Sequence, residues 1–225
     1  MHIEPGLVDG AKITLSYATA AAAGATGLWY ARHAITQRGV TSLMIRSVLA
    51  AVLTFVFFEI LPTFPVGVSE VHFILGSTLF LILGAGPAAF GLAFGLLIQG
   101  LFFAPFDLPQ YGINVTTLLV PLFAVKTLAS KIITPGTAYV DLKYSQALAL
   151  STAFQGGVVL WVGFWAFYGQ GFGAANVASV MSFGAAYMLV VLIEPLVDLA
   201  VLAGAKSVKG LRESGLVTPR LYSAA

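Results

Sequence analysis

The sequence predicts an all-α membrane protein, a single bundle of about seven transmembrane helices with its N-terminus outside and its C-terminus inside. Of its 225 residues 59% are hydrophobic and only 9% are charged, whereas a soluble domain carries about 25% charged residues. Long apolar stretches alternate with loops rich in proline and glycine. The cationic residues gather in alternate loops, which predicts the orientation.

Seven apolar stretches are long enough, or nearly so, to cross a hydrocarbon core of about 30 Å. We expect the helices at residues 13–31, 45–61, 72–83, 87–104, 113–133, 146–168 and 177–203. The third stretch is too short to span the core alone at about 1.5 Å per residue, so its start is expected inside the protein. Residues 1–205 would form one membrane-embedded domain that begins with a polar segment, residues 1–10, and residues 206–225 a basic cytoplasmic tail.

The positive charges give the orientation, because loops rich in Lys and Arg face the cytoplasm. With seven spans, ten of the eleven cations fall on one side and only Lys12 on the other. The N-terminus, His2 and His72 then lie outside, and His33 lies inside as an interfacial residue. The ten cations on the inner side are Arg32, Arg38, Arg46, Lys126, Lys131, Lys143, Lys206, Lys209, Arg212 and Arg220.

The first ten residues carry a possible metal chelate. They do not resemble a signal peptide, because the start is not basic and Glu4, Pro5 and Gly6 stand where an apolar region should begin. Met1 is expected to remain, because a large residue follows it. Its α-amine, the His2 amide nitrogen and the His2 imidazole can close two fused chelate rings, a donor set suited to Ni(II) or Cu(II) and usable by Co(II). The alternative is a frayed terminus without function.

His72 is the candidate for a fourth nitrogen. It follows a loop rich in proline and glycine and is predicted on the same side as His2, in a third helix opened by residues 69–72. Alone it is equally well a helix-start residue that touches lipid headgroups; together with His2 the ligand interpretation is better. Cysteine is absent, which excludes a thiolate site.

These residues resemble the CbiM/NikM family, the substrate-binding membrane subunits of cobalt/nickel energy-coupling-factor (ECF) transporters. The resemblance covers about residues 1–125, and the C-terminal half matches only in hydropathy. Leu7 and Val71 depart from the family pattern, which commonly has an aromatic residue after the glycine and serine directly before the histidine. The matching features are Met1-His2-Ile3 followed by an acid, proline and glycine, then His72, Gly84, Pro87, Leu97-Ile98-Gln99-Gly100-Leu101-Phe102 and Gly112-Ile113-Asn114.

The resemblance implies a square-planar site for Co(II) or Ni(II) as transported substrate, with no prosthetic group. Its four nitrogens would be the Met1 amine, the His2 amide, the His2 imidazole and the His72 imidazole. Asn114 and Ser69 would orient the binding segments without touching the metal. The implied partners are a transmembrane coupling subunit, two ATPase subunits and a small accessory membrane subunit; no nucleic acid is expected.

Small residues recur at four-residue intervals in the first helix, where another helix can approach closely. Ala18 and Ala22 form one such pair and Ala20 and Gly24 another. In the resembling family such a helix docks on the coupling subunit; internal packing is an equally good explanation here.

Glu194 and Asp198 lie four residues apart near the cytoplasmic end of the last predicted helix. Intramembrane carboxylates are functional candidates, but we favour a structural pairing with Lys or Arg of the tail. An intramembrane enzyme that uses them as an acid/base pair is a second hypothesis, although the sequence shows no third polar group facing them. A capture subunit for an organic solute is a third. The chain has no phosphate-binding loop of the Walker type, so an ATPase must be another polypeptide, and the chain itself is not expected to be an enzyme.

Overall fold

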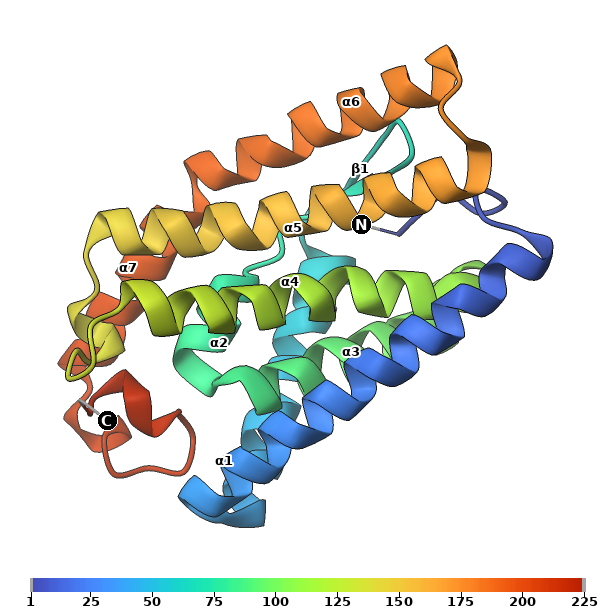
Figure 1. Ribbon diagram of the computed structural model, residues 1–225. Helices are drawn as coiled ribbons and strands as arrows, with labels where there is room; N and C mark the ends of the chain where they lie inside the picture. Colours follow the sequence, from blue (N-terminus) through green and yellow to red (C-terminus); the bar gives the residue numbers. More distant parts are fainter. Residues whose placement is uncertain (1, 224–225) are drawn as a thin grey trace.

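The structure, a computed structural model, describes residues 2–223 apart from the side chain of residue 209. It is a helical bundle with one short β-hairpin (Figure 1). The helices are α1 (Thr14–Phe55), α2 (Gly76–Leu83), α3 (Ala85–Phe102), α4 (Tyr111–Ile132), α5 (Tyr144–Gln170), α6 (Ala174–Met188) and α7 (Glu194–Ser207); the strands are β1 (Phe64–Val66) and β2 (Ser69–Val71). A π-helical turn, Val56–Ile60, extends α1, and the 3₁₀ turns are Gly10–Ile13, Pro105–Gln110, Tyr139–Asp141, Leu189–Leu192, Lys209–Leu211 and Pro219–Leu221.

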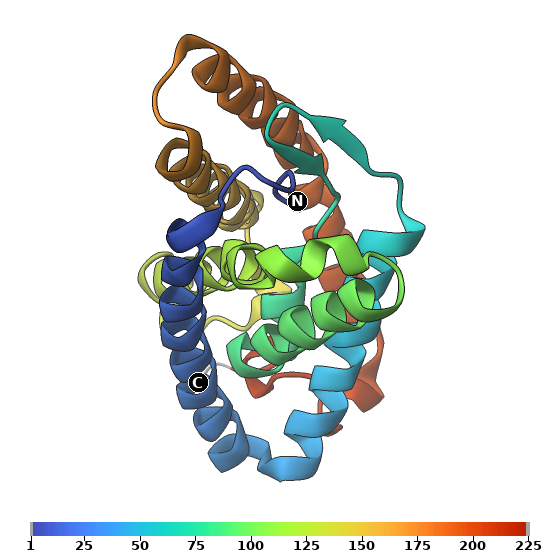
Figure 2. The same cartoon turned by 90° about the vertical axis from the view of Figure 1, so that its right-hand side faces the viewer.

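Helix α1 contains the first two predicted helices, with no long loop between them. The chain reverses at Gly39, whose φ of 81° and ψ of 171° are not helical. In Figure 2 the first leg runs downward on the left and the second leg runs back upward on the right, so the two diverge from the bend. The predicted loop after residue 31 was therefore wrong: only one residue breaks the helix, and a positive φ there favours glycine.

The third predicted helix begins later than expected. Residues 69–71 form β2, and α2 starts only at Gly76, so His72 lies in extended chain between strand and helix. The last predicted helix, residues 177–203, is also not continuous. It breaks between α6 and α7 around Pro195, which can donate no backbone hydrogen bond to the preceding turn.

Within residues 2–223, five segments are long and apolar enough to cross a membrane. They are Gly10–Ile60, Ala85–Phe102, Pro105–Ile132, Tyr144–Gln170 and Ala174–Ser207. The first contains both legs of α1, and the short α2 does not qualify. The all-α, multi-pass membrane architecture is thus confirmed, while the helix boundaries differ from those predicted.

The C-terminal segment packs against one end of the bundle. Arg38 donates hydrogen bonds to the carbonyls of Ser214 (2.8 Å) and Arg212 (3.1 Å). The Thr218 amide bonds the Ile82 carbonyl at 2.8 Å, and Lys206 pairs with Asp141 at 2.6 Å. Lys12 is not part of this end: it donates a hydrogen bond to the carbonyl of Gly169 in the last turn of α5. The tail is therefore a packed cap on the bundle.

The second leg of α1 packs on α3 through glycine. A Cβ at Gly91 would lie 2.0 Å from the Cβ of Ala50, and a Cβ at Gly95 would lie 2.7 Å from the Cβ of Thr54. Both distances are below van der Waals contact, so only glycine lets the helices approach this closely. This contact fixes α3, whose far end reaches the site described below.

We expect Gly91→Ala to destabilise the protein by about 1–3 kcal/mol, because the added methyl group must push the helices apart. Gly24→Ala is the matched control: Gly24 is helical too, but nothing lies within 4 Å of the point that a Cβ would occupy there. Thermal unfolding in detergent measures both. Equal unfolding midpoints for the two variants would contradict the packing argument.

Candidate metal site

The N-terminal segment lies inside the molecule as an added strand on β2. Ile3 pairs with Ser69 in an antiparallel bridge, the Glu70 amide bonds the His2 carbonyl at 3.3 Å, and the Glu4 amide bonds the Val68 carbonyl at 3.1 Å. Ile3 and His2 are buried, at 1% and 5% exposure. The backbone pairing sets the register and so places His2 beside Glu70.

Two further contacts anchor the same segment from its sides. The Ile3 amide donates to Asn114 Oδ1 at 3.0 Å, and Ser69 Oγ donates to the His2 carbonyl at 2.9 Å. Both polar side chains are buried, Asn114 on α4 and Ser69 on β2. Within the described chain the His2 amide has no hydrogen-bond acceptor, unlike the amides of Ile3 and Glu4. Asn114 and Ser69 therefore hold the backbone of the segment and leave the His2 nitrogen uncommitted.

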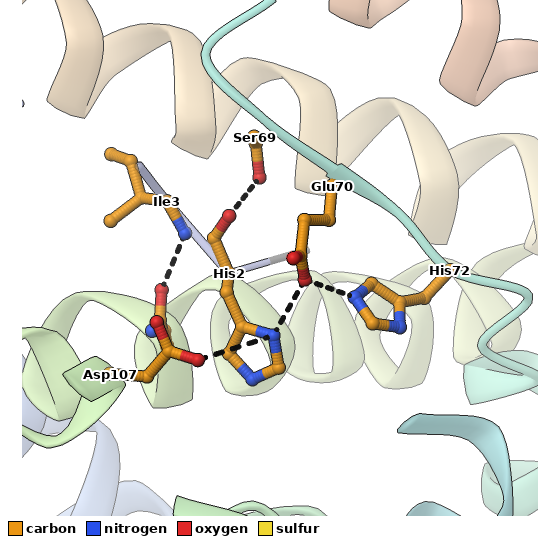
Figure 3. Close-up of polar contacts among 7 residues, drawn as sticks. His2, Ile3, Ser69, Glu70, His72 and Asp107 are labelled. Carbon is orange, nitrogen blue, oxygen red and sulfur yellow. Dashed lines mark hydrogen bonds and ion pairs between the residues drawn. The ribbon is translucent and has the colours of Figure 1, made fainter. Parts of the chain in front are cut away.

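The imidazoles of His2 and His72 meet at one carboxylate oxygen (Figure 3). His2 Nδ1 lies 3.0 Å and His72 Nε2 lies 2.9 Å from Glu70 Oε2. The ring centroids are 5.3 Å apart and nearly perpendicular, at 82°. One ligand atom from each of the three residues falls within 4.8 Å of the others. This spacing suits a single ion bound among them.

The protonation of the site follows from these contacts. Hydrogen bonds from both histidines hold the pKa of the Glu70 carboxyl well below its usual range, so Glu70 is ionised. Burial lowers the pKa of His72 to about 3, so its ring is neutral at pH 7. Both nitrogens that face the carboxylate then carry hydrogen. The opposite ring nitrogens, His2 Nε2 and His72 Nδ1, are buried without a partner in the described chain.

A polar cavity of about 270 Å³ opens beside the two imidazoles. Three carboxylates line it, those of Glu59, Glu70 and Asp107, and no Lys or Arg whose side chain the structure describes does so. Asp107 Oδ2 is 3.8 Å from His2 Nδ1, on the other side of the ring from Glu70 (Figure 3). The negative potential of these three carboxylates attracts cations and raises their local concentration.

Glu70, Asp107 and Phe58 were given no role from the sequence. Glu70 stands two positions before His72, the spacing that places side chains on one face of a strand, but the segment was predicted to be helical. Phe58, in the π-helical turn, contacts both imidazoles, with ring centroids 5.1 Å from His2 and 4.7 Å from His72. No sequence pattern marks that contact. The predicted ligand Met1 lies outside the described residues.

His33 and the small residues of α1 lie away from this site. His33 is exposed and contacts Gln37 within α1. Of the predicted docking residues, Ala18, Ala22 and Gly24 are exposed and Ala20 is partly buried. The neighbouring Gly27 instead faces α3, where its Cβ position lies 3.7 Å from Ala89. Internal packing thus uses another face of the helix.

Glu194 and Asp198 are fully buried, and the predicted pairing with tail cations was wrong: neither belongs to an ion pair among the described residues. Hydroxyl and amide groups of α2 and α5 surround them, so the statement that no third polar group faces them was also wrong. Ser77 Oγ lies 2.9 Å from Glu194 and 2.7 Å from Asp198; the other partners are Thr78 to Asp198, and Ser151 (2.5 Å) and Gln155 (2.7 Å) to Glu194. The prediction chose the tail because its cations are nearest in sequence, whereas the two carboxylates accept hydrogen bonds from hydroxyl groups of α2 inside the bundle.

Comparison with known protein families matches nearly the whole chain. Residues 2–210 match the family described as "CbiM: Cobalt uptake substrate-specific transmembrane region". No curated protein matches the chain, and no solved structure does. The match covers both site histidines and every candidate membrane span. The chain therefore belongs to the CbiM family, the substrate-specific membrane components of cobalt uptake.

Proposed function

We propose that this protein captures Co(II) or Ni(II) from outside the cell as the substrate-specific component of an ECF-type ABC transporter. The observation that carries the proposal is the convergence of His2 Nδ1 and His72 Nε2 on one point, at 3.0 and 2.9 Å from Glu70 Oε2. Two histidines far apart in the sequence meet there only because the N-terminal segment inserts beside β2. An N-terminal segment whose imidazole meets that of His72 in the interior is an arrangement suited to chelation.

The four proposed ligands are the Met1 amine, the His2 amide, His2 Nδ1 and His72 Nε2. The amine, amide and Nδ1 of a chain that begins Met-His close two fused rings, and His72 completes the plane. Four such nitrogens favour Ni(II), and can serve Co(II). The unused His2 amide fits this role, because an amide already bonded to a protein acceptor would have to break that bond before it ionised.

Charge balance supplies a role for Glu70. A divalent ion with one ionised amide leaves one positive charge in a largely buried site. The adjacent Glu70 carboxylate compensates that charge, which a buried ion requires. In the metal-free protein the same carboxylate holds the two imidazoles at ligand spacing. When the ion binds, each ring gives up the hydrogen that faces Glu70 and carries one on its opposite nitrogen.

The bundle would carry the site at its outer end and the tail in the cytoplasm. The end opposite the site is rich in cations around the C-terminal segment, which supports this orientation by the positive-inside rule. These cations are Arg38, Arg46, Arg212 and Arg220. The exposed face of Ala18, Ala22 and Gly24, with Ala20 at its edge, would contact a transmembrane coupling subunit. ATP hydrolysis would take place on two separate ATPase subunits, and a small accessory membrane subunit would complete the assembly.

The other two hypotheses have less support. An organic solute would not need two imidazoles and three carboxylates around its cavity. An enzyme that used Glu194 and Asp198 would need substrate access, yet both are 0% exposed. Their hydrogen bonds to α2 and α5 are those of a structural group that ties α7 to the bundle.

His72→Ala should weaken equilibrium binding of Ni(II) or Co(II) to the purified chain by more than the roughly 10–100-fold that loss of an outer-shell group costs. His33→Ala, which removes an exposed histidine at the far end, is the control and should bind as the wild type does. Isothermal titration at fixed pH measures both. Unchanged affinity in His72→Ala would exclude this residue as a ligand.

A reporter fused after Ala225 should be active only in the cytoplasm, because the cationic end of the bundle faces inward. Paired reporters, one active inside and one active outside the membrane, read this directly. Activity only on the outer side would invert the proposed orientation and place the metal site on the cytoplasmic face.

A further inference from the structure

A second polar cavity lies at the end of α3 opposite the metal site. It has a volume of about 290 Å³ and is lined by both legs of α1, by α2, the start of α3 and α4, and by the C-terminal segment. Arg46, Lys126 and Arg220 line it, together with His33 and two tyrosines, and no acidic side chain does. The cavity is therefore a concentrated positive site within the part of the chain that the structure describes.

Arg46 is the unusual member of this cavity. It is 1% exposed, and its Nε and Nη1 bond only neutral acceptors: Ser42 Oγ at 3.1 Å and the Leu83 carbonyl at 2.7 Å. Its Nη2 is buried without a hydrogen-bond partner among the described residues. A guanidinium keeps its charge when buried, and an unpaired buried charge is costly. Arg46, which lines the cavity, thus carries a buried charge that no acidic group of the described chain balances, and an anion in the cavity would balance it.

The N-terminus of α3 contributes to the same cavity. Its N-cap is Gly84, with a φ of 90°, which has no side chain to cap the helix. The amides of Ala85 and Gly86 have no intrahelical acceptor at this position, and Pro87 has no N–H. A Cβ at Gly84 would lie 3.5 Å from Arg46 Nη1. The guanidinium and the positive end of an 18-residue helix therefore meet at one place.

We propose that this cavity binds a phosphate group, that of an anionic phospholipid headgroup. It lies between the end of α2 and the start of α3, at the end of the bundle that the proposed orientation places in the cytoplasm. Basic pockets between helices on that side bind such headgroups. Free phosphate has the same chemistry, and the experiment separates the two sources. The cavity is separate from the metal site, which lies near Gln99 at the other end of α3, while its cytoplasmic placement rests on the proposed orientation.

The full-length protein, purified in detergent, is titrated with phosphatidylglycerol, with phosphatidylcholine and with inorganic phosphate, and bound lipid is counted by native mass spectrometry. Phosphatidylglycerol should bind more tightly than phosphatidylcholine. Lys126→Gln should weaken that binding about fivefold, the contribution of one cation near a headgroup. Lys131→Gln is the matched control, on the same helix but outside the cavity, and should bind as the wild type does.

Arg46→Lys provides a second test. It keeps the charge but loses the guanidinium, including its bonds to Ser42 and the Leu83 carbonyl, and it should weaken phosphatidylglycerol binding. Thermal unfolding of this variant checks that the protein still folds. Binding of inorganic phosphate alone, with the same dependence on Lys126, would keep the phosphate site and overturn the lipid as its source. Equal effects of Lys126→Gln and Lys131→Gln, or no preference between the two lipids, would overturn the site.

Discussion

The site depends on backbone pairing between the N-terminal segment and β2. The Ile3–Ser69 bridge and the bonds from Asn114 and Ser69 fix the backbone of this segment, so His2 meets Glu70 and His72 with little freedom left. A shift of one residue in this register would turn His2 to the other face. The remaining bundle serves this placement: α4 supplies Asn114, the π-helical turn supplies Phe58, and the close contact of α1 with α3 positions Gln99 at the cavity.

Much of the fold could be predicted from the sequence, because hydropathy over about 20 residues is a strong signal. The helices now seen as α3, α4 and α5 begin and end within about two residues of their predicted limits, within the usual error of such boundaries. The predicted helix boundaries were wrong where one or a few residues determine the backbone conformation. Gly39 alone replaces a loop, Pro195 divides a helix, and residues 69–75 form strand and extended chain although their composition reads as a helix start.

The candidate site was predictable only in part, for a related reason. His2 and His72 could be paired because both are rare residue types assigned to one side of the membrane. Glu70 and Asp107 are also on that side, but surface acids are common, and only the fold shows that their oxygens approach His2 Nδ1. Arg46 is the opposite case: the sequence places it at the cytoplasmic start of the second predicted helix as one of the inner-side cations, whereas the structure buries it beside the start of α3.

The central claim is that the amino terminus itself chelates the metal, and one added residue before Met1 tests it. The addition turns the amine into a peptide nitrogen, moves the histidine to position 3 and lengthens a segment whose register is fixed by β2. The measurement is Ni(II) and Co(II) uptake, with equilibrium binding by the purified protein, for the native and extended chains at matched expression. The account predicts that the N-terminal extension abolishes uptake while folding persists, and that a C-terminal tag is tolerated. Metal binding by the native chain should also weaken as pH falls, because the ligand nitrogens must be unprotonated. Uptake at the native rate by an extended or N-acetylated protein would contradict it.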